Sequence, residues 1–171
     1  MRKKIGLVGG MIVLIIGLVY SFPALGEVGI GLGTHYNVAL KEIDISNFDN
    51  SHLSYVASLR TKTAWIMLDG GLEYRPNLGD ISYTVSPRIS FLVDILGSGI
   101  YGGAGVQKTY IQWTSGTSEW SNLTYLLQAG WEVRLGAISL TLDAQYESPI
   151  FSVQDINTDF VTFGARVFIY F

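Results

Sequence analysis

The stretch LTYLLQAGWEVRLGAISLTLDAQY, residues 123–146, decides the fold. From Leu123 to Leu135 every second residue is apolar, and most of the residues between them are polar or glycine. The same alternation resumes from Ile138 to Tyr146, after a tight connection at Gly136. A period of two places successive side chains on opposite faces of a strand, whereas a helix would mix the two sets. This stretch therefore predicts two antiparallel strands, each with one apolar and one polar face.

The same test applied outward from this stretch predicts six further strands. They cover residues 28–36, 53–60, 64–75, 81–94, 100–111 and 160–171. Lys108 falls in the apolar phase of 100–111. Long connections at 37–52, 76–80, 112–122 and 147–159 alternate with short ones at 61–63, 95–99 and 136. This rhythm is typical of an up-and-down barrel, so we predict an all-β, eight-stranded antiparallel transmembrane β-barrel.

The N-terminus has the pattern of a cleavable signal peptide. Residues 1–4 carry three basic side chains, and the stretch from Ile5 to Phe22 is apolar or glycine except for Ser21. Pro23 and the small residues of Ala24-Leu25-Gly26 then suit cleavage before Glu27. We predict a signal peptide over 1–26 and a barrel domain over 27–171. An uncleaved membrane anchor is the alternative, because the apolar stretch comes close to the length of a bilayer span.

The composition excludes several classes of protein and site. The chain has 171 residues, no cysteine, 2 histidines and a formal net charge of −3. Disulfides and thiolate sites are therefore absent, and neither a metal centre nor another cofactor is expected. A nucleic-acid binder needs a basic face, which this charge argues against.

Either face of the strands could point outward, and three patterns favour an apolar exterior in lipid. Glycines recur in the polar phase, where they leave room for larger neighbours in a narrow lumen. The same phase carries matched charges, as expected of ions enclosed in a lumen. The predicted lumenal ion-pair network comprises Asp69, Glu73, Arg75, Arg88, Glu132, Arg134, Asp143 and Arg166.

The third pattern is a series of aromatic residues at one level of the apolar phase. One aromatic residue per strand near the long connections is typical of an interfacial girdle, where amphipathic rings lie at headgroup depth. The predicted girdle comprises Tyr36, Tyr55, Tyr74, Tyr83, Tyr110, Tyr125, Tyr146 and Phe163.

The whole mature chain resembles the small eight-stranded outer-membrane β-barrels of Gram-negative-type bacteria, the OmpA/OmpX-like superfamily, most closely in three segments. They are Tyr101-Gly-Gly-Ala-Gly-Val106, Gln128-Ala-Gly-Trp-Glu-Val133 and the terminal strand. The resemblance implies an outer-membrane location and assembly by the barrel-assembly machinery. It also implies that the terminal strand carries the signal read by that machinery, through Thr162, Gly164, Val167, Ile169 and Phe171. Because the terminal strand ends at Phe171, we expect no peptidoglycan-binding domain of the kind that two-domain members carry.

The resemblance requires a test for catalysis, because the family includes lipid A-modifying enzymes. Lipid A deacylases use a His-x-Ser pair with an acid, and His52-x-Ser54 has that minimal spacing. A histidine at a loop edge beside a strand serine explains the pair more simply, and His35 is interpreted as a lumenal or rim histidine. The carboxylates of the polar phase are explained by ion pairs rather than by acid catalysis.

The long connections are acidic and carry aromatic residues. Their acids are Glu42, Asp44, Asp49, Asp80, Glu119, Glu147, Asp155 and Asp159, and Phe48, Trp113 and Trp120 accompany them. Loops on a rigid scaffold often bind partners. A surface ligand or a divalent cation is one hypothesis for this rim, and a solvated charged rim is the other.

The sequence thus predicts a monomeric, non-enzymatic outer-membrane barrel with a plugged polar lumen. Its partners are outer-membrane lipid, the assembly machinery and a surface ligand, and its role is envelope integrity or surface adhesion. Two alternatives stay open at this point: a lipid A-modifying outer-membrane enzyme, and a secreted lipocalin-like carrier with its apolar phase inside.

Overall fold

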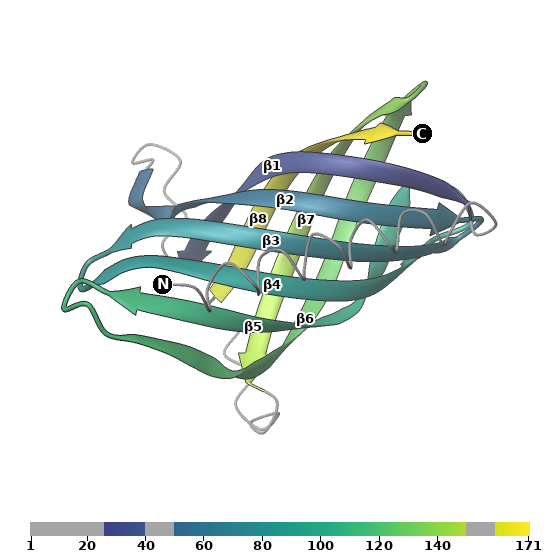
Figure 1. Cartoon of the computed structure of the whole chain (residues 1–171). Coiled ribbons are helices and arrows are strands. Elements are labelled where there is room, and N and C mark those ends of the chain that lie inside the picture. Colours follow the sequence, from purple (N-terminus) through teal and green to yellow (C-terminus); the bar gives the residue numbers. More distant parts are fainter. Residues whose placement is uncertain (1–25, 40–49, 150–159) are drawn as a thin grey trace, which may run out of the picture.

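The computed structural model describes residues 26–39, 50–149 and 160–171, and these residues form a closed antiparallel barrel (Figure 1). Neighbouring strands pair in chain order, and β1 closes the barrel by pairing with β8 from Gly29↔Tyr170 to Ala39↔Phe160. The prediction of eight up-and-down strands is therefore confirmed. The strands are β1 (Glu27–Ala39), β2 (Leu53–Thr63), β3 (Ile66–Leu78), β4 (Ile81–Asp94), β5 (Ile100–Trp113), β6 (Ser118–Leu135), β7 (Ile138–Pro149) and β8 (Phe160–Tyr170).

Tight connections lie at one end of the barrel, on the right in Figure 1, as the alternation predicts. The connection between β2 and β3 differs: it was predicted at 61–63 and lies at 64–65. β2 continues to Thr63 and β3 begins at Ile66, so the predicted strand 64–75 started two residues too early. The reason is the backbone of Ala64, whose φ of 49° is left-handed and belongs to a turn.

At the opposite end, two connections predicted as long loops prove to be strand. β3 runs to Leu78 and β4 starts at Ile81, so 76–80 is a hairpin with Gly79 in its turn. β5 runs to Trp113 and β6 starts at Ser118, so most of 112–122 is also strand. Register shifts in this region disturb the alternation, which explains why the pattern was missed. The other two predicted long connections fall largely on 40–49 and 150–159, outside the described residues.

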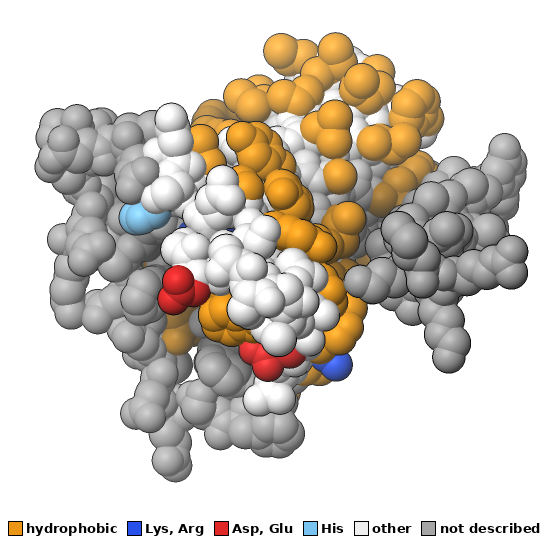
Figure 2. Space-filling view, turned by 60° about the vertical axis from the view of Figure 1, so that its left-hand side comes forward, with side chains coloured by type: hydrophobic (Ala, Val, Ile, Leu, Met, Phe, Trp, Pro, Cys, Tyr) orange, Lys and Arg blue, Asp and Glu red, His pale blue; other side chains and the backbone are white. Residues whose placement is uncertain are grey.

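The apolar phase faces outward and the polar phase faces inward. On β7, Leu140 and Leu142 are exposed while Ser139, Thr141 and Asp143 are buried. Figure 2, which brings the loop end forward, shows hydrophobic side chains spread over the barrel wall and few charged ones. This arrangement is that of a barrel in lipid and the reverse of a lipocalin-like carrier, so that alternative is wrong.

Within the described part of the chain, no helix is long and apolar enough to cross a membrane. The one helical element described is a single 3₁₀ turn, η2 (Asn50–His52), which leads into β2. The barrel wall thus sets the positions of all the side chains considered below.

Candidate functional site

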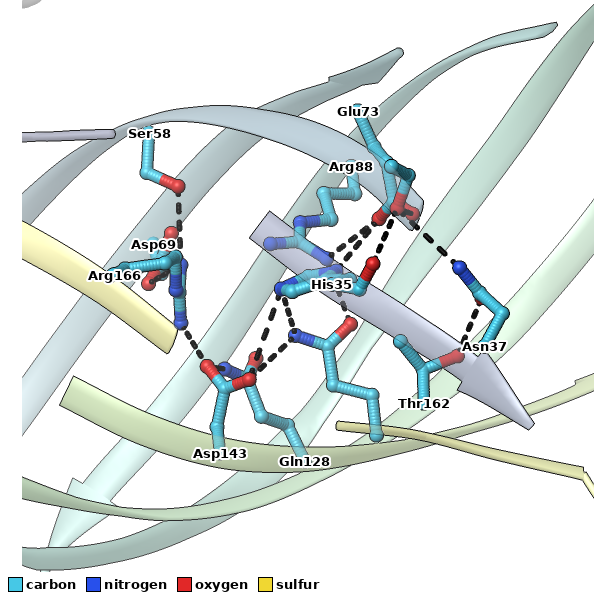
Figure 3. A network of polar contacts seen from close by, with 12 residues as sticks. His35, Asn37, Ser58, Asp69, Glu73, Arg88, Gln128, Asp143, Thr162 and Arg166 are labelled. Carbon is cyan, nitrogen blue, oxygen red and sulfur yellow. Dashed lines mark hydrogen bonds and ion pairs between the residues drawn. The ribbon is translucent and has the colours of Figure 1, made fainter. Parts of the chain in front are cut away.

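The centre of the lumen is a chain of buried ion pairs (Figure 3). Arg166 on β8 lies between two carboxylates, with Nη1 3.0 Å from Asp69 and Nη2 2.5 Å from Asp143. It also donates a hydrogen bond to Ser58, at 3.0 Å. Arg60 donates to the same Asp69 at 2.6 Å, so one carboxylate joins two guanidinium groups. Both arginines are fully buried, and burial without these partners would be strongly unfavourable.

The guanidinium group of Arg60 is also enclosed by aromatic rings. Its carbon lies 4.2 Å from the ring centroid of Phe168 and 5.3 Å from that of Tyr101. Rings at these distances attract a cation through their faces. A buried apolar cluster of Met67, Leu92 and Tyr101 lies in the same part of the described lumen. Polar and apolar side chains therefore lie together in this part of the lumen.

Toward the loop end, Glu73 collects three donors. Its Oε2 lies 2.9 Å from His35 Nδ1 and 3.3 Å from Arg88 Nη1, and its Oε1 accepts from Ser54 at 2.5 Å. Arg88 Nη1 also donates to Gln145, at 2.7 Å. His35 is completely buried, and Figure 3 shows its ring between Glu73 and the Asp143 side of the lumen. This cluster joins side chains of five strands.

Toward the tight-turn end, Lys62 binds two carboxylates. Its Nζ lies 2.8 Å from Asp94 and 3.1 Å from Glu132, and Tyr170 donates its hydroxyl to Glu132 at 2.6 Å. An open pocket of about 400 Å³ adjoins these residues. The charges of Lys62, Asp94 and Glu132 are paired with one another. We therefore interpret the pocket as part of the structural rim and not as a ligand site.

The structure divides the predicted ion-pair residues into three groups. Asp69, Glu73, Arg88, Glu132, Asp143 and Arg166 lie in the lumenal network. Arg134 does not: it is 37% exposed at the tight-turn rim, where it pairs with Glu27 and covers the ring of Tyr170. Arg75 is half-buried, and its Nε has no hydrogen-bond partner among the described residues.

Sequence reasoning omitted four members of the network: His35, Arg60, Lys62 and Asp94. His35, Arg60 and Asp94 stand in the polar phase of their predicted strands, so phase alone could have found them. Lys62 was assigned to a connection because the predicted strand ended at residue 60. The alternation along a strand shows which residues face the lumen. Which of them form ion pairs depends on the register across several strands.

The lumenal glycines make room for large side chains opposite them. A Cβ built on Gly31 would lie 2.5 Å from the ring of Phe168, and one on Gly130 would lie 2.5 Å from the hydroxyl of Tyr101. Along the β1–β8 seam, β1 glycines oppose bulky residues in register, as Gly29↔Tyr170, Gly31↔Phe168 and Gly33↔Arg166. Glycine at these three β1 positions therefore leaves room for the large side chains of β8.

On the outer wall, four aromatic side chains from consecutive strands form a continuous row, here called the aromatic row. Tyr74 and Tyr83 have ring centroids 5.9 Å apart, Tyr83 and Tyr110 6.4 Å, and Tyr110 and Trp120 5.3 Å. Three of these were predicted as girdle residues. Trp120 was placed in a loop and lies instead on β6.

The other predicted girdle residues lie on the remaining strands. Tyr55, Tyr125 and Phe163 are exposed, and Tyr36 and Tyr146 are partly exposed. Tyr36 pairs with Phe163 across the β1–β8 seam and has a ring contact with His52, at 5.8 Å between centroids. These positions are compatible with a girdle around the loop end of the wall.

The His52-x-Ser54 pair does not form a nucleophile with its base. Ser54 is fully buried and donates to Glu73, whereas His52 lies on η2. Asn37 Nδ2 donates to the His52 carbonyl and to Ser54 Oγ, at 3.2 and 3.3 Å. His52 Nδ1 itself has no hydrogen-bond partner among the described residues.

The predicted assembly-signal residues alternate across β8. Thr162 and Gly164 face the lumen, where Thr162 donates to Asn37 Oδ1 at 2.8 Å. Val167, Ile169 and Phe171 are exposed. The acidic rim is described only at Asp80, Glu119 and Glu147, all exposed. Phe48 and the other acids of the rim lie outside the described residues.

No known family model matches this sequence, and no curated protein is significantly similar to it. The fold resembles that of Neisserial surface protein A, with a TM-score of 0.51, 12% identity, and coverage of 85% of this chain and 96% of that one. Two structures of Ail, the attachment invasion locus protein of Yersinia pestis, give TM-scores of 0.48 and 0.49 at 16% and 15% identity. Each covers 86% of this chain and 99% of Ail, and one is a complex with the heparin analogue sucrose octasulfate.

The fold is that of a small eight-stranded outer-membrane barrel. Together with the exposed apolar wall, it is the architecture of a protein that spans an outer membrane.

Proposed function

We propose that this chain is a non-enzymatic outer-membrane barrel that binds a partner protein at its loop end. The observation that carries the proposal is the hairpin of β5 and β6, which continues past the aromatic row. On one side of this hairpin, β6 pairs with β5 from Gln112↔Ser118. On the other side, β6 pairs with β7 only from Thr124↔Pro149.

Residues 118–123 therefore have a paired strand on one side only, within the described part of the chain. Five of the six are exposed, Ser121 being the exception. An unpaired strand edge presents backbone N–H and C=O groups, and an extended segment of another protein can add to it as a further strand.

The charge of this end selects the kind of partner. Asp80 and Glu119 flank the hairpin, Glu147 lies at the end of β7, and all three are exposed. Like charges across an interface are unfavourable, so a basic or neutral segment fits better than a sulfated polysaccharide. The ligand class seen with Ail is thus not the one that this surface favours.

The lumen supports a closed barrel rather than a pore. Its charged groups are paired and buried, and eight strands enclose only enough space for packed side chains. The geometry of Ser54 supports the absence of catalysis, because its hydroxyl donates to Glu73 instead of to a histidine. These contacts favour a structural lumen over a conducting or catalytic one.

Export and assembly complete the proposal. Residues 1–26 are a cleaved signal peptide, residues 27–171 are the barrel domain, and the aromatic girdle fixes its height in the bilayer. Thr162, Gly164, Val167, Ile169 and Phe171 form the signal for the barrel-assembly machinery. The barrel functions as a monomer.

The test uses cells that display the full chain, applied to wells coated with fibronectin, laminin, collagen or heparin. We expect adhesion to at least one of the coated proteins and none to heparin. In a shortened variant, an Asn-Gly turn joins Thr109 to Asn122 and removes the exposed edge, so adhesion should fall to the level of cells without the protein.

Two controls separate the edge from its surroundings. Thr117→Ala alters the turn and keeps the edge, so it should adhere like the wild type. Glu119→Gln keeps the edge and removes one negative charge, so the change in adhesion measures the electrostatic contribution of Glu119. Full adhesion by the shortened variant, folded as judged by gel mobility before and after boiling, would contradict the proposal.

A further inference from the structure

Lys108 is a charged side chain on the apolar wall of β5. It is exposed, and it follows the outward-facing residues Ala104 and Val106 along the strand. The other described lysines and arginines on the strands project into the lumen or lie at the tight-turn rim, as Arg134 does. Within the described residues, Lys108 is therefore the only cation on the outer wall near the loop end.

A β-bulge brings an aromatic ring to this lysine. Lys108 pairs with Leu123 and Tyr110 pairs with Trp120, so β6 has one residue more than β5 between the two pairs. In a regular strand Trp120 would face the lumen when Leu123 faces outward, because the two are three residues apart. Thr109 N–H donates to Ser121 Oγ at 2.9 Å and closes the bulge. The irregularity thus aims Trp120 outward.

The ammonium group of Lys108 has a ring beside it and no acid. Its Nζ lies 5.8 Å from the ring centroid of Trp120, whose own neighbour in the aromatic row is Tyr110. None of the described carboxylates forms an ion pair with it. The hairpin acid Glu119 accepts a hydrogen bond from Trp113 Nε1 at 3.3 Å. Lys108 therefore lacks an internal counter-charge among the described residues.

The height of Lys108 on the wall decides what can supply that charge. On one side of it lies the apolar wall, which includes Ile89 and Phe91 of the neighbouring strand β4. On the other side lies the aromatic row, where rings of this kind occupy the headgroup region. A lysine at that boundary extends its ammonium group toward the headgroups, whose phosphates are the anions available there.

We infer that Lys108, Tyr110 and Trp120 form a binding site for the phosphate of an outer-leaflet lipid headgroup. The lipid's acyl chain would continue along Val106 and Ala104, which gives a lipid an advantage over free phosphate. The inference rests on the proposed membrane orientation and is independent of partner binding by the β6 edge.

The experiment measures lipid binding by the full-length mature barrel in detergent, using native mass spectrometry. The probes are bisphosphorylated lipid A, monophosphoryl lipid A and inorganic phosphate. We expect Lys108→Gln to weaken lipid A binding about fivefold or more, since one lysine near an anionic lipid surface contributes on that scale. Lys108→Arg should restore most of the binding, and Trp120→Ala should weaken it less than Lys108→Gln.

Arg134→Gln is the matched control. Arg134 is also exposed and also lies over a ring, at 4.8 Å from the Tyr170 centroid, but it is at the opposite end and is paired with Glu27. Its replacement should leave lipid A binding unchanged. Equal binding by Lys108→Gln and wild type would overturn the inference, as would equal losses in Lys108→Gln and Arg134→Gln.

Two further outcomes identify other failures. Displacement of lipid A by millimolar inorganic phosphate would assign the site to a free anion and would contradict the lipid. A protein with no heat-dependent gel shift and no lipid binding in any variant would contradict the membrane barrel itself. If the gel shift is present and the Lys108 variants bind lipid A as the wild type does, only this inference is contradicted.

Discussion

Leu126 and Leu127 are neighbours on β6, yet one is completely buried and the other is 55% exposed. Leu126 packs in a lumen crowded with ion pairs, whereas Leu127 belongs to a wall with almost no polar groups. The comparison shows that the two faces of the barrel have opposite requirements. The lumen must pair its buried charges, whereas the wall below the aromatic row must contain none. Substitutions should therefore fail for opposite reasons on the two sides.

The largest effect is expected from breaking the lumenal pairs. Arg166→Met leaves Asp69 and Asp143 without the cation between them, in a site where both are buried. Removing one partner of a buried pair typically costs about 3–5 kcal/mol. The free energy of unfolding, measured with urea in lipid vesicles by tryptophan fluorescence, should fall by this amount.

The same change at the rim provides the control. Arg134→Met also removes a guanidinium group from a carboxylate, that of Glu27, but both partners are exposed. Exposed pairs contribute about 0–1 kcal/mol, so the variant should unfold almost as the wild type does. Equal losses in the two variants would mean that burial does not separate the lumen from the rim.

A charge placed on the lipid-facing wall tests the opposite requirement. Leu127→Arg introduces a guanidinium group on the lipid-facing side of β6, where Leu127 pairs with Tyr146 of β7 and Ala104 of β5. An arginine on the lipid-facing side costs about 2–4 kcal/mol near the bilayer midplane and about 0–1 kcal/mol near the interfaces. Because Leu127 lies opposite the predicted girdle residue Tyr146, the loss of stability should fall between these values. The same urea titration checks it, with Leu127→Ala as a size control. An arginine variant as stable as the alanine variant would show that this part of the wall does not lie in lipid.

The surroundings of each strand segment, membrane or water, explain which parts of the fold could be predicted from the sequence. Inside the membrane the two faces of a strand meet lipid and lumen, so the alternation is strict and all eight strands could be located. Beyond the membrane both faces meet water, and the extension of β5 and β6 through 112–122 lost the signal. The bulge beside Lys108 also reversed the phase there, which hid the outward position of Trp120.

The sequence predicted which side chains face the lumen, but not how far along the barrel axis each of them lies. Glu132 and Arg134 share a phase, but two residues along a strand move a side chain by about 7 Å, and Arg134 thereby reaches the rim. The pairing of Arg166 with Asp69 joins β8 to β3, which are not neighbours in the sheet, and depends on the register of every strand between them. No pattern within one strand carries that information.

The smallest effect is expected from a single methyl group, and it compares the two sides most finely. Gly31→Ala places a Cβ 2.5 Å from the ring of Phe168, which is itself held against Arg60. Overpacking of this kind costs about 1–3 kcal/mol.

Gly102→Ala adds the same methyl group on the wall side of β5, where the nearest atom is the Gln128 carbonyl oxygen at 3.7 Å. Because glycine weakens a strand interior, this variant should match or exceed the wild type in stability, by up to about 1 kcal/mol. The difference between the two alanine variants in urea unfolding isolates lumenal packing from strand propensity, since backbone and substitution are alike. Equal stabilities would show that Phe168 can move aside, and that the glycines of β1 are not required for β8 to fill the lumen.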